Sequence, residues 1–440
     1  MQTHDAEEIT RKYVDYPKIT VIGSIIKNKV LNLRTNLKSN LKIGRMTNNA
    51  LINRAMASTI KEYFKYLPVI TLTGPRQSGK TTLCRNLFAD LPYANLEDMA
   101  TLEEAQMDSK AFLAKFPQGA IIDEAQNFPK IFSYLQVLVD DDRIKGKDRR
   151  FIVTGSNNFV LMQHITQSMA GRTAVMSLLP LSTEEILTIY PDATTSQLIL
   201  CGGYPAIWRG GMEGRQILLS SYYSTYVERD VRSLINIKDL YAFQKFIRLA
   251  AGRIGREFNT SALSVEVGVS VPTIKSWLGV LSASYVVYLL QPYYSNIGKR
   301  LTKTPKLYFY DTGLACFLLG INTVEQLDTH PLRGSLFENM VVNDMLKNGL
   351  NRGRQESLFF YRDKSQREVD ILRLRQDDTL EAYEIKAGMT FHTEYFKNLH
   401  YLQSIIGERM KRTAVIYDGD QENQQLIDGY CNFRHLCLES

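Results

Sequence analysis

The sequence of 440 residues lacks the features of a membrane, secreted or disulfide-bonded protein. Its five cysteines are scattered and odd in number, and no two pairs have zinc-ligand spacing, which favours isolated reduced thiols. The longest apolar runs, such as V-V-Y-L-L at 286–290, are far shorter than the roughly 18 residues that span a bilayer. The acidic N-terminus, M-Q-T-H-D-A-E-E, is unlike a secretory signal. These absences predict a cytoplasmic protein with no membrane partner.

The chain also lacks an evenly distributed positive charge. Its formal net charge is +7, but residues 1–60 hold ten Lys/Arg and four Asp/Glu, so the rest of the chain is almost neutral. Overall basicity is therefore weak evidence for a nucleic-acid partner of the core. Residues 1–57 are predicted to be an N-terminal extension. This is either a basic arm or the result of a start assigned too far upstream, and we favour the second.

Short apolar strands alternate with helical periodicity in the first half of the chain. The strands are predicted at 69–73, 93–96, 120–123 and 151–155, which indicates a parallel sheet with helices on both faces. Residues from about 185 to 283 have helical patterns, and strands mix with helices again from about 305. The fold class is therefore α/β, with a helical part and a second α/β unit.

Residues 74–81, G-P-R-Q-S-G-K-T, match the phosphate-binding pattern G-x-x-x-x-G-K-[S/T] between a predicted strand and a predicted helix. Glycines let backbone N–H groups turn toward phosphate oxygens, and the helix N-terminus adds partial positive charge. Lys80 is expected to reach the β- and γ-phosphates, and Thr81 to approach Mg²⁺. The predicted ATP-binding residues are Gly74, Pro75, Arg76, Gln77, Ser78, Gly79, Lys80, Thr81 and Thr82.

Two further motifs follow predicted strands. In G-A-I-I-D-E-A-Q, 119–126, Asp123 and Glu124 end a buried strand, at the sheet edge where ligands bind. Asp123 is predicted to hold Mg²⁺, and Glu124 to polarise the water that attacks the γ-phosphate. In F-I-V-T-G-S-N-N, 151–158, Asn157 is either a γ-phosphate sensor or part of an ordinary turn. Arg172 is either a surface arginine or an arginine finger, acting in its own subunit or in a neighbour.

Residues 259–283 have the pattern of a helix-turn-helix. Gly268 fits the turn, Ser270 is a good N-cap, and Ile274, Trp277, Leu278 and Leu281 have core spacing. A strand-like stretch follows, as a winged helix requires. Arg253, Arg256, Lys299, Arg300 and Lys303 flank it, but the second helix carries one cation, Lys275. The element therefore serves either nucleic-acid binding or packing and protein contacts.

Four residues near the C-terminus could form a metal site. Strand alternation places Glu384 and Lys386 on one face, Asp370 lies on the preceding strand, and Glu338 lies on an upstream helix. Two carboxylates that hold Mg²⁺ beside a lysine can activate water for phosphodiester cleavage. The spacing D-x(13)-E-x-K is loose, however, and exposed E-x-K strands are common.

Together these motifs resemble predicted bacterial and archaeal AAA+ ATPases with an uncharacterised C-terminal domain. Besides the motifs above, the resemblance is carried by L-P-L-S-T-E-E, C-G-G-Y-P, Y-V-E-R-D-V, P-K-L-Y-F-Y-D-T-G-L, G-S-L-F-E-N and Y-R-D-K-x-x-x-E-V-D, from about residue 58 to the end. It implies ATP binding and hydrolysis at Lys80, Thr81, Asp123 and Glu124, with Asn157 as sensor. It also implies a restriction-endonuclease-like C-terminal domain, whose signature falls on Asp370, Glu384 and Lys386, with Glu338 upstream.

We therefore expect an AAA+ P-loop domain at 58–185, a helical lid at 186–240, a winged helix at 241–300 and a restriction-endonuclease-like domain at 301–440. The predicted cofactors are ATP and Mg²⁺, and an oligomer is compatible with the motifs. The favoured function is an ATPase that couples its nucleotide state to a C-terminal module acting on DNA or RNA, with nuclease activity as one outcome. The alternative is a nucleotide-gated protein-interaction module with an inactive C-terminal domain.

Overall fold

The computed structural model describes residues 52–156, 164–165, 168–225, 239–293 and 304–436. Asn157, the flanking cations at 299, 300 and 303, and most of the predicted N-terminal extension lie outside these residues. Within the described ranges, no helix is both long and apolar enough to cross a membrane. The cytoplasmic location remains a prediction.

The first part of the chain folds around a five-stranded parallel sheet of order β2-β3-β4-β1-β5. The four predicted strands are confirmed, and β5 was not predicted. Every residue of β1 and β3 is buried, as a parallel sheet covered on both faces requires. The strands are β1 (Val69–Thr73), β2 (Tyr93–Asn95), β3 (Gly119–Asp123), β4 (Arg150–Thr154) and β5 (Thr173–Ser177).

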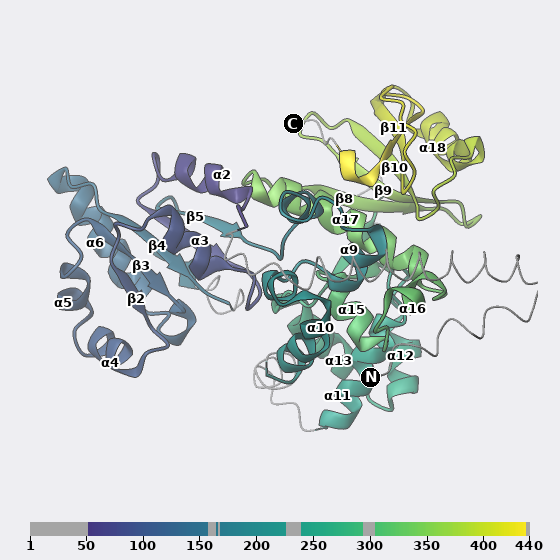
Figure 1. Ribbon diagram of the computed structural model, residues 1–440. Coiled ribbons are helices and arrows are strands. Elements are labelled where there is room, and N and C mark those ends of the chain that lie inside the picture. The colour runs from purple at the N-terminus through teal and green to yellow at the C-terminus, as the bar shows by residue number, and fades with distance from the viewer. Residues whose placement is uncertain (1–51, 157–163, 166–167, 226–238, 294–303, 437–440) are drawn as a thin grey trace, which may run out of the picture.

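Helices pack on both faces of this sheet (Figure 1). Val69 and Phe151 belong to one hydrophobic cluster, whereas Ile70 and Ile152 belong to another. Neighbouring residues of one strand thus enter different cores, as the two-residue period of a strand demands. The helices are α2 (Met56–Tyr63), α3 (Lys80–Leu87), α4 (Met99–Met107), α5 (Ser109–Ala114) and α6 (Ile131–Lys145). Helix α2 begins inside the predicted extension, and Met56 is fully buried.

The middle of the chain is helical, as predicted. Gly268 ends α12 with φ 89°, and the Ser270 side chain accepts a hydrogen bond from the backbone N–H of Thr273 at the start of α13. The predicted turn and N-cap of the helix-turn-helix are therefore confirmed. The helices are α8 (Thr183–Leu187), α9 (Thr195–Cys201), α10 (Pro205–Tyr222), α11 (Leu240–Ala251), α12 (Thr260–Val267), α13 (Val271–Ala283), α15 (Thr312–Leu318) and α16 (Val324–Asp328).

A seven-stranded mixed sheet of order β12-β11-β10-β9-β8-β6-β7 forms the last part of the structure. Strands β6 and β7 pair antiparallel on either side of the boundary predicted at residue 300, so one sheet spans both predicted domains. The predicted domain limits remain predictions. The strands are β6 (Val287–Pro292), β7 (Lys306–Phe309), β8 (Ser357–Arg362), β9 (Glu368–Leu374), β10 (Leu380–Lys386), β11 (Met410–Tyr417) and β12 (Gly429–Asn432), with helices α17 (Arg333–Asn351) and α18 (Lys397–Ile406).

The helical part and one face of the second sheet share a single core. This hydrophobic cluster includes Ile199 of α9, residues of α11 to α13 and α17, and buried members of β9 and β10 such as Ile371 and Tyr383. The cluster around Leu372 and Leu402 covers the opposite face of the sheet. The helix-turn-helix is thus packed firmly onto the C-terminal sheet.

Candidate functional site

The predicted phosphate-binding loop, residues 74–81, joins β1 to α3. Gly74, Gln77 and Gly79 have positive φ angles of 141°, 61° and 95°. A Cβ atom at Gly74 would lie 2.2 Å from the carbonyl oxygen of Leu178, so only glycine fits there. The Ser78 hydroxyl is buried and has no hydrogen-bond partner. A tight loop with an unpaired buried hydroxyl fits a ligand that carries hydrogen-bonding oxygens.

The Lys80 side chain lies under this loop. Its ammonium group donates hydrogen bonds to the carbonyl oxygens of Gly74 at 3.0 Å and Pro75 at 2.8 Å. Burial, aided by Arg76 and opposed by Glu124 and Asp123, lowers the pKa of Lys80 to about 8. The neutral carbonyl oxygens do not compensate the charge of this buried ammonium group. An anionic ligand such as a phosphate would bind it more strongly than they do.

Asp123, at the end of β3, is the centre of a hydrogen-bond network. The hydroxyls of Thr81 and Tyr93 each donate to its Oδ2 at 2.7 Å. The Thr154 hydroxyl and the backbone N–H of Glu124 donate to its Oδ1. The hydroxyl of Thr81 and the carboxylate of Asp123 are hard oxygen ligands of the kind that Mg²⁺ prefers, so these residues fit the predicted ion.

Glu124 is held in place by its neighbours. Its backbone is left-handed, with φ 56°, and its carboxylate accepts hydrogen bonds from Gln126 and, at 3.5 Å, from Ser156. Sequence reasoning missed Gln126, Thr154 and Tyr93. Gln126 and Thr154 could have been predicted from the sequence. Gln126 stands two residues after Glu124, and Thr154 lies at the carboxyl end of β4. No sequence signal marked Tyr93.

Arg172 lies at the end of the sheet opposite the phosphate-binding loop. It directly precedes β5, and Thr173 pairs in register with Val69 at the start of β1, whereas the phosphate loop follows the end of β1. Its guanidinium binds Asp140 of α6 through two hydrogen bonds, at 2.7 and 2.8 Å. The five residues of β1, at about 3.3 Å each, separate the two edges. This position favours a role toward a neighbouring subunit over one toward its own site.

A pocket of about 370 Å³ adjoins the loop and the first turn of α3. Thr82 and Gly79 line it from the loop side, and Pro205 and Arg209 of α10 line it from the helical part. Arg54 closes the pocket from the segment before α2, and its guanidinium donates to the carbonyl oxygen of Ser78 at 2.7 Å. The pocket has the position expected for the rest of a nucleotide whose phosphates occupy the loop.

The four C-terminal residues predicted from sequence converge where β9 and β10 separate. The antiparallel ladder ends at Ile371, and beyond it the Asp370 carboxylate accepts the backbone N–H of Ile385 at 2.8 Å. Glu384 Oε1 lies 2.6 Å from the ammonium group of Lys386. The parting of the strands gives these polar side chains room beside the sheet.

The electrostatics of this cluster favour a cation. Burial, and then Asp370, raise the pKa of Glu338 to about 7 and that of Glu384 to about 8. Glu384 Oε2 is buried without a hydrogen-bond partner. No group of three or more His, Cys, Asp or Glu among the described residues is arranged to hold a metal ion. Two carboxylates can suffice, since Mg²⁺ commonly keeps water and substrate oxygens as its other ligands.

The helix-turn-helix shows a mostly neutral surface. Lys275 and Ser276 of α13 are exposed, whereas Trp277 is buried as predicted. Arg253 forms an ion pair with Glu266. The element also touches the ATPase part, because the Tyr285 hydroxyl, just after α13, lies 3.0 Å from the Thr73 hydroxyl at the end of β1.

Helix α17 connects the two candidate sites. Glu338 is near its start, and Lys347 donates to the carbonyl oxygen of Leu181 at 2.8 Å. Near its end, Asn351 accepts a hydrogen bond at 2.7 Å from Thr59 of α2. Figure 1 shows α17 between α2 and the second sheet. At 1.5 Å per residue, the helix spans about 20 Å from Glu338 to Asn351.

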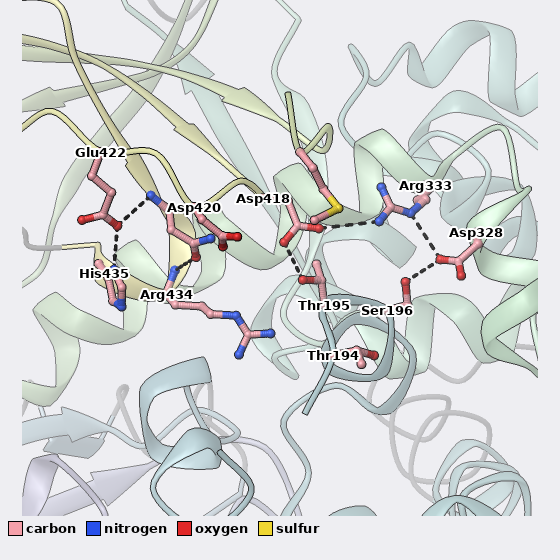
Figure 2. A pocket seen from close by; sticks show the side chains of 12 residues that line it. Thr194, Thr195, Ser196, Asp328, Arg333, Asp418, Asp420, Glu422, Arg434 and His435 are labelled. Atoms are coloured by element: carbon pink, nitrogen blue, oxygen red, sulfur yellow. Dashed lines mark hydrogen bonds and ion pairs between the residues drawn. The ribbon is translucent and has the colours of Figure 1, made fainter. Parts of the chain in front are cut away.

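A separate pocket of about 890 Å³ lies between α9 and the C-terminal strands (Figure 2). Thr195 of α9 donates to Asp418, after β11, at 2.6 Å, and Arg333 lies 3.7 Å from the same carboxylate. His435 and Glu422 are 2.6 Å apart on the other side. These charged groups pair with one another. Their contacts connect the helical part to the second sheet.

Comparison with known families identifies the first part of the chain. Residues 67–187 match the AAA domain family, residues 193–325 a domain of unknown function, DUF8612, and residues 333–434 a second one, DUF4143. The chain contains an AAA-type P-loop ATPase domain. This identity confirms the predicted fold of the first sheet and supports ATP binding and hydrolysis by the AAA domain.

The chain is also similar to uncharacterized bacterial proteins along most of its length. It is 27% identical to the protein Rv2008c of Mycobacterium tuberculosis over 379 residues, covering 83% of this chain and 80% of that protein. It is 23% identical to a Haemophilus influenzae protein over 397 residues, covering 81% and 90%.

Similar solved structures include the Walker-type ATPase PABY2304 of Pyrococcus abyssi. It is 12% identical, with a TM-score of 0.40 over 61% of this chain and 96% of that one. The RuvB Holliday junction branch migration motor of Thermotoga maritima is 18% identical, with a TM-score of 0.28 over 53% of this chain and 85% of that one.

Proposed function

We propose that the AAA domain hydrolyses ATP with Mg²⁺ and that its nucleotide state controls a C-terminal module acting on nucleic acid. Lys80 binds the β- and γ-phosphates in exchange for its present carbonyl partners. Thr81 and Asp123 hold Mg²⁺, which neutralises phosphate charge when bound. Glu124, oriented by Gln126, takes the proton of the attacking water. The pocket beside Arg54 receives the nucleoside.

The observation that carries the coupling is the path of α17. One end of this helix contacts α2 and Leu181, and the other end brings Glu338 close to Asp370, with Lys306 in contact with both. ATP contacts at the phosphate loop can shift Arg54 and the segments bonded to it. A rigid helix transmits such a shift to the second sheet.

In the C-terminal module, Asp370 and Glu384 hold a divalent cation, which polarises a phosphate oxygen or a water when bound. Lys386, 2.6 Å from Glu384, opposes the rise in the pKa of that carboxyl and supplies positive charge beside the scissile phosphate. Glu338 remains hydrogen-bonded to Tyr308 at the back of the site. The reaction class is phosphodiester hydrolysis in DNA or RNA.

A protein-interaction module is the second candidate. The observation that favours it is the surface of α13, which exposes a single cation, Lys275, and so gives few phosphate contacts. In this case ATP-driven motion would present the helix-turn-helix to a protein, and no phosphodiester bond would be cut.

The deciding experiment incubates labelled DNA and RNA with purified protein and Mg²⁺, with and without ATP. Asp370→Ala and Lys80→Ala are tested beside the unmodified protein, and Asp377→Ala serves as an exposed acidic control between β9 and β10. Cleavage lost in Asp370→Ala supports the nuclease, and dependence on Lys80 makes it ATP-driven. Intact ATP hydrolysis without cleavage, and without salt-sensitive nucleic-acid binding, supports the interaction module.

A further inference from the structure

Lys306, at the start of β7, places a buried cation among the C-terminal carboxylates. Its ammonium group lies 2.6 Å from Glu368 Oε1, 3.2 Å from Glu338 Oε1 and 3.8 Å from Asp370 Oδ1. The side chain is 2% exposed. Lys306 therefore acts on the carboxylates of the site and does not reach a substrate directly.

The fold holds Lys306 in this position. Helix α17 covers the open edge of β7, where Asn339 exchanges two hydrogen bonds of 2.8 Å with the backbone of Phe309. Lys306 and Tyr308, two residues apart, lie on the same face of β7, and both donate a hydrogen bond to Glu338. Moving the ammonium group away would leave buried carboxylates without a counter-charge, which is strongly unfavourable.

The charges of the cluster leave room for one divalent cation. Four carboxylates, from Glu338, Glu368, Asp370 and Glu384, face two ammonium groups, from Lys306 and Lys386. The Arg362 guanidinium lies 3.6 Å from Glu368 and is balanced by Glu257 at 3.4 Å. When all are ionised, two negative charges remain. One Mg²⁺ or Mn²⁺ balances them, whereas a second would leave this partly buried cluster with an excess positive charge.

The cluster contains one buried oxygen without a partner, which is available as a ligand for that cation. Glu384 is 7% exposed, and its Oε2 has no hydrogen-bond partner. Asp370 lies between Lys306 and strand β10, because its Oδ1 faces Lys306 while its Oδ2 accepts a hydrogen bond from the backbone N–H of Ile385. In two-metal sites a second ion lies about 3.5–4 Å from the first. The Lys306 ammonium group, 3.8 Å from Asp370 Oδ1, already places a positive charge beside this carboxylate.

We propose that Lys306 is the permanent second cation of the C-terminal site, so that the site takes a single divalent cation, held by Asp370 and Glu384. This inference rests on the proposed cation site and assigns Lys306 as a positioning residue. It implies a one-metal hydrolysis in which Lys306 fixes Glu338, Glu368 and Asp370 without touching the phosphate.

The test is a titration of the full-length protein with Mn²⁺ alone, without nucleotide, followed by electron paramagnetic resonance of the free ion. All proteins carry Thr81→Ala, which removes the hydroxyl ligand of the AAA domain. The ions that disappear on Asp370→Asn are those of the C-terminal site. The proposal predicts one ion per chain lost on this substitution.

The Lys306 variants test whether the charge of Lys306 is what limits the site to one ion. Lys306→Gln removes the charge and keeps hydrogen-bonding capacity, and we expect two Mn²⁺ ions per chain, with the first bound roughly tenfold more tightly. Lys306→Arg keeps the charge and should still bind one. Lys347→Met, which removes a buried lysine farther along α17, is the matched control and should also bind one.

Each outcome separates the two proposals. Two ions in the unmodified site overturn the role of Lys306 but leave the cation site standing, and this result does not depend on whether a variant folds. One ion in both the unmodified protein and a folded Lys306→Gln also overturns it. No Asp370-dependent ion at all overturns the cation site itself, and with it the proposed nuclease.

Discussion

The guanidinium of Arg54 donates a hydrogen bond to the carboxylate of Glu185 across 3.0 Å, and these side chains are only 6% and 3% exposed. The same guanidinium donates to the carbonyl oxygens of Ser78 and Leu179, both at 2.7 Å. Glu185 in turn accepts the backbone N–H of Ser182 in the capping box of α8. This pair ties the phosphate loop, the segment before α2 and the helical part together.

Arg54→Ala should destabilise the protein strongly. The substitution leaves the Glu185 carboxylate buried without its charge partner, and breaking a buried pair in this way costs about 3–5 kcal/mol. Denaturant unfolding of the full chain measures this change. Arg54→Lys keeps the charge but not the forked hydrogen bonds, and should lose less. Equal stability of Arg54→Ala and the unmodified protein would mean that the pair contributes little.

Lys80→Ala should lower ATP hydrolysis by roughly a hundredfold or more, because it removes the buried positive charge facing the phosphates. Phosphate release measured at saturating ATP and Mg²⁺ tests this. Lys110→Ala, an exposed lysine of the same domain, is the control and should leave the rate unchanged. Comparable activity of the two variants would place the nucleotide elsewhere.

Glu124→Gln should bind ATP normally and hydrolyse it at least about a hundredfold more slowly, since the amide cannot take a proton from water. Gln126→Ala should have a smaller effect on the rate, because Gln126 acts only through the position of Glu124. Binding of a fluorescent ATP analogue, compared with single-turnover hydrolysis, separates the two steps. A loss of binding in Glu124→Gln would contradict this assignment.

ATP affinity should fall as the pH rises above about 8. Burial holds the pKa of Lys80 near 8 without nucleotide, and the phosphates raise it when they bind. Above pH 8 the free protein must therefore take up a proton to bind ATP, which weakens binding by up to about tenfold per pH unit. Calorimetric titration in buffers of different ionisation enthalpy measures the proton uptake. Lys80→Arg stays charged and should bind independently of pH over this range.

Mixing two inactive variants should restore ATP hydrolysis if Arg172 acts on a neighbouring subunit. Lys80→Ala has a defective loop but an intact Arg172, and Arg172→Ala has the reverse. In a mixed oligomer, an intact loop meets an intact arginine. If the mixture is no more active than the separate variants at any protein concentration, Arg172 does not act on a neighbouring subunit. Its role would then be the ion pair with Asp140.

The sequence by itself determined the local features of this protein. The phosphate loop, the Asp123–Glu124 strand end and the Ser270 N-cap were predictable, because each depends on residues close together in the chain and on the two-residue period of strands. The parallel direction of the first strands followed from the alternation of strands and helices. The family match at 67–187 agrees with these local signals.

Only the tertiary structure decided which distant residues meet. Arg54 and Glu185 are 131 positions apart, and Lys306 reaches Glu338 from 32 positions away. It also decided that Arg172 faces Asp140 at the edge opposite the phosphate loop. Such contacts depend on strand order, on crossovers and on which helix covers an open strand edge, and many arrangements satisfy the same local periodicity. Packing and the pairing of buried charges select one of them.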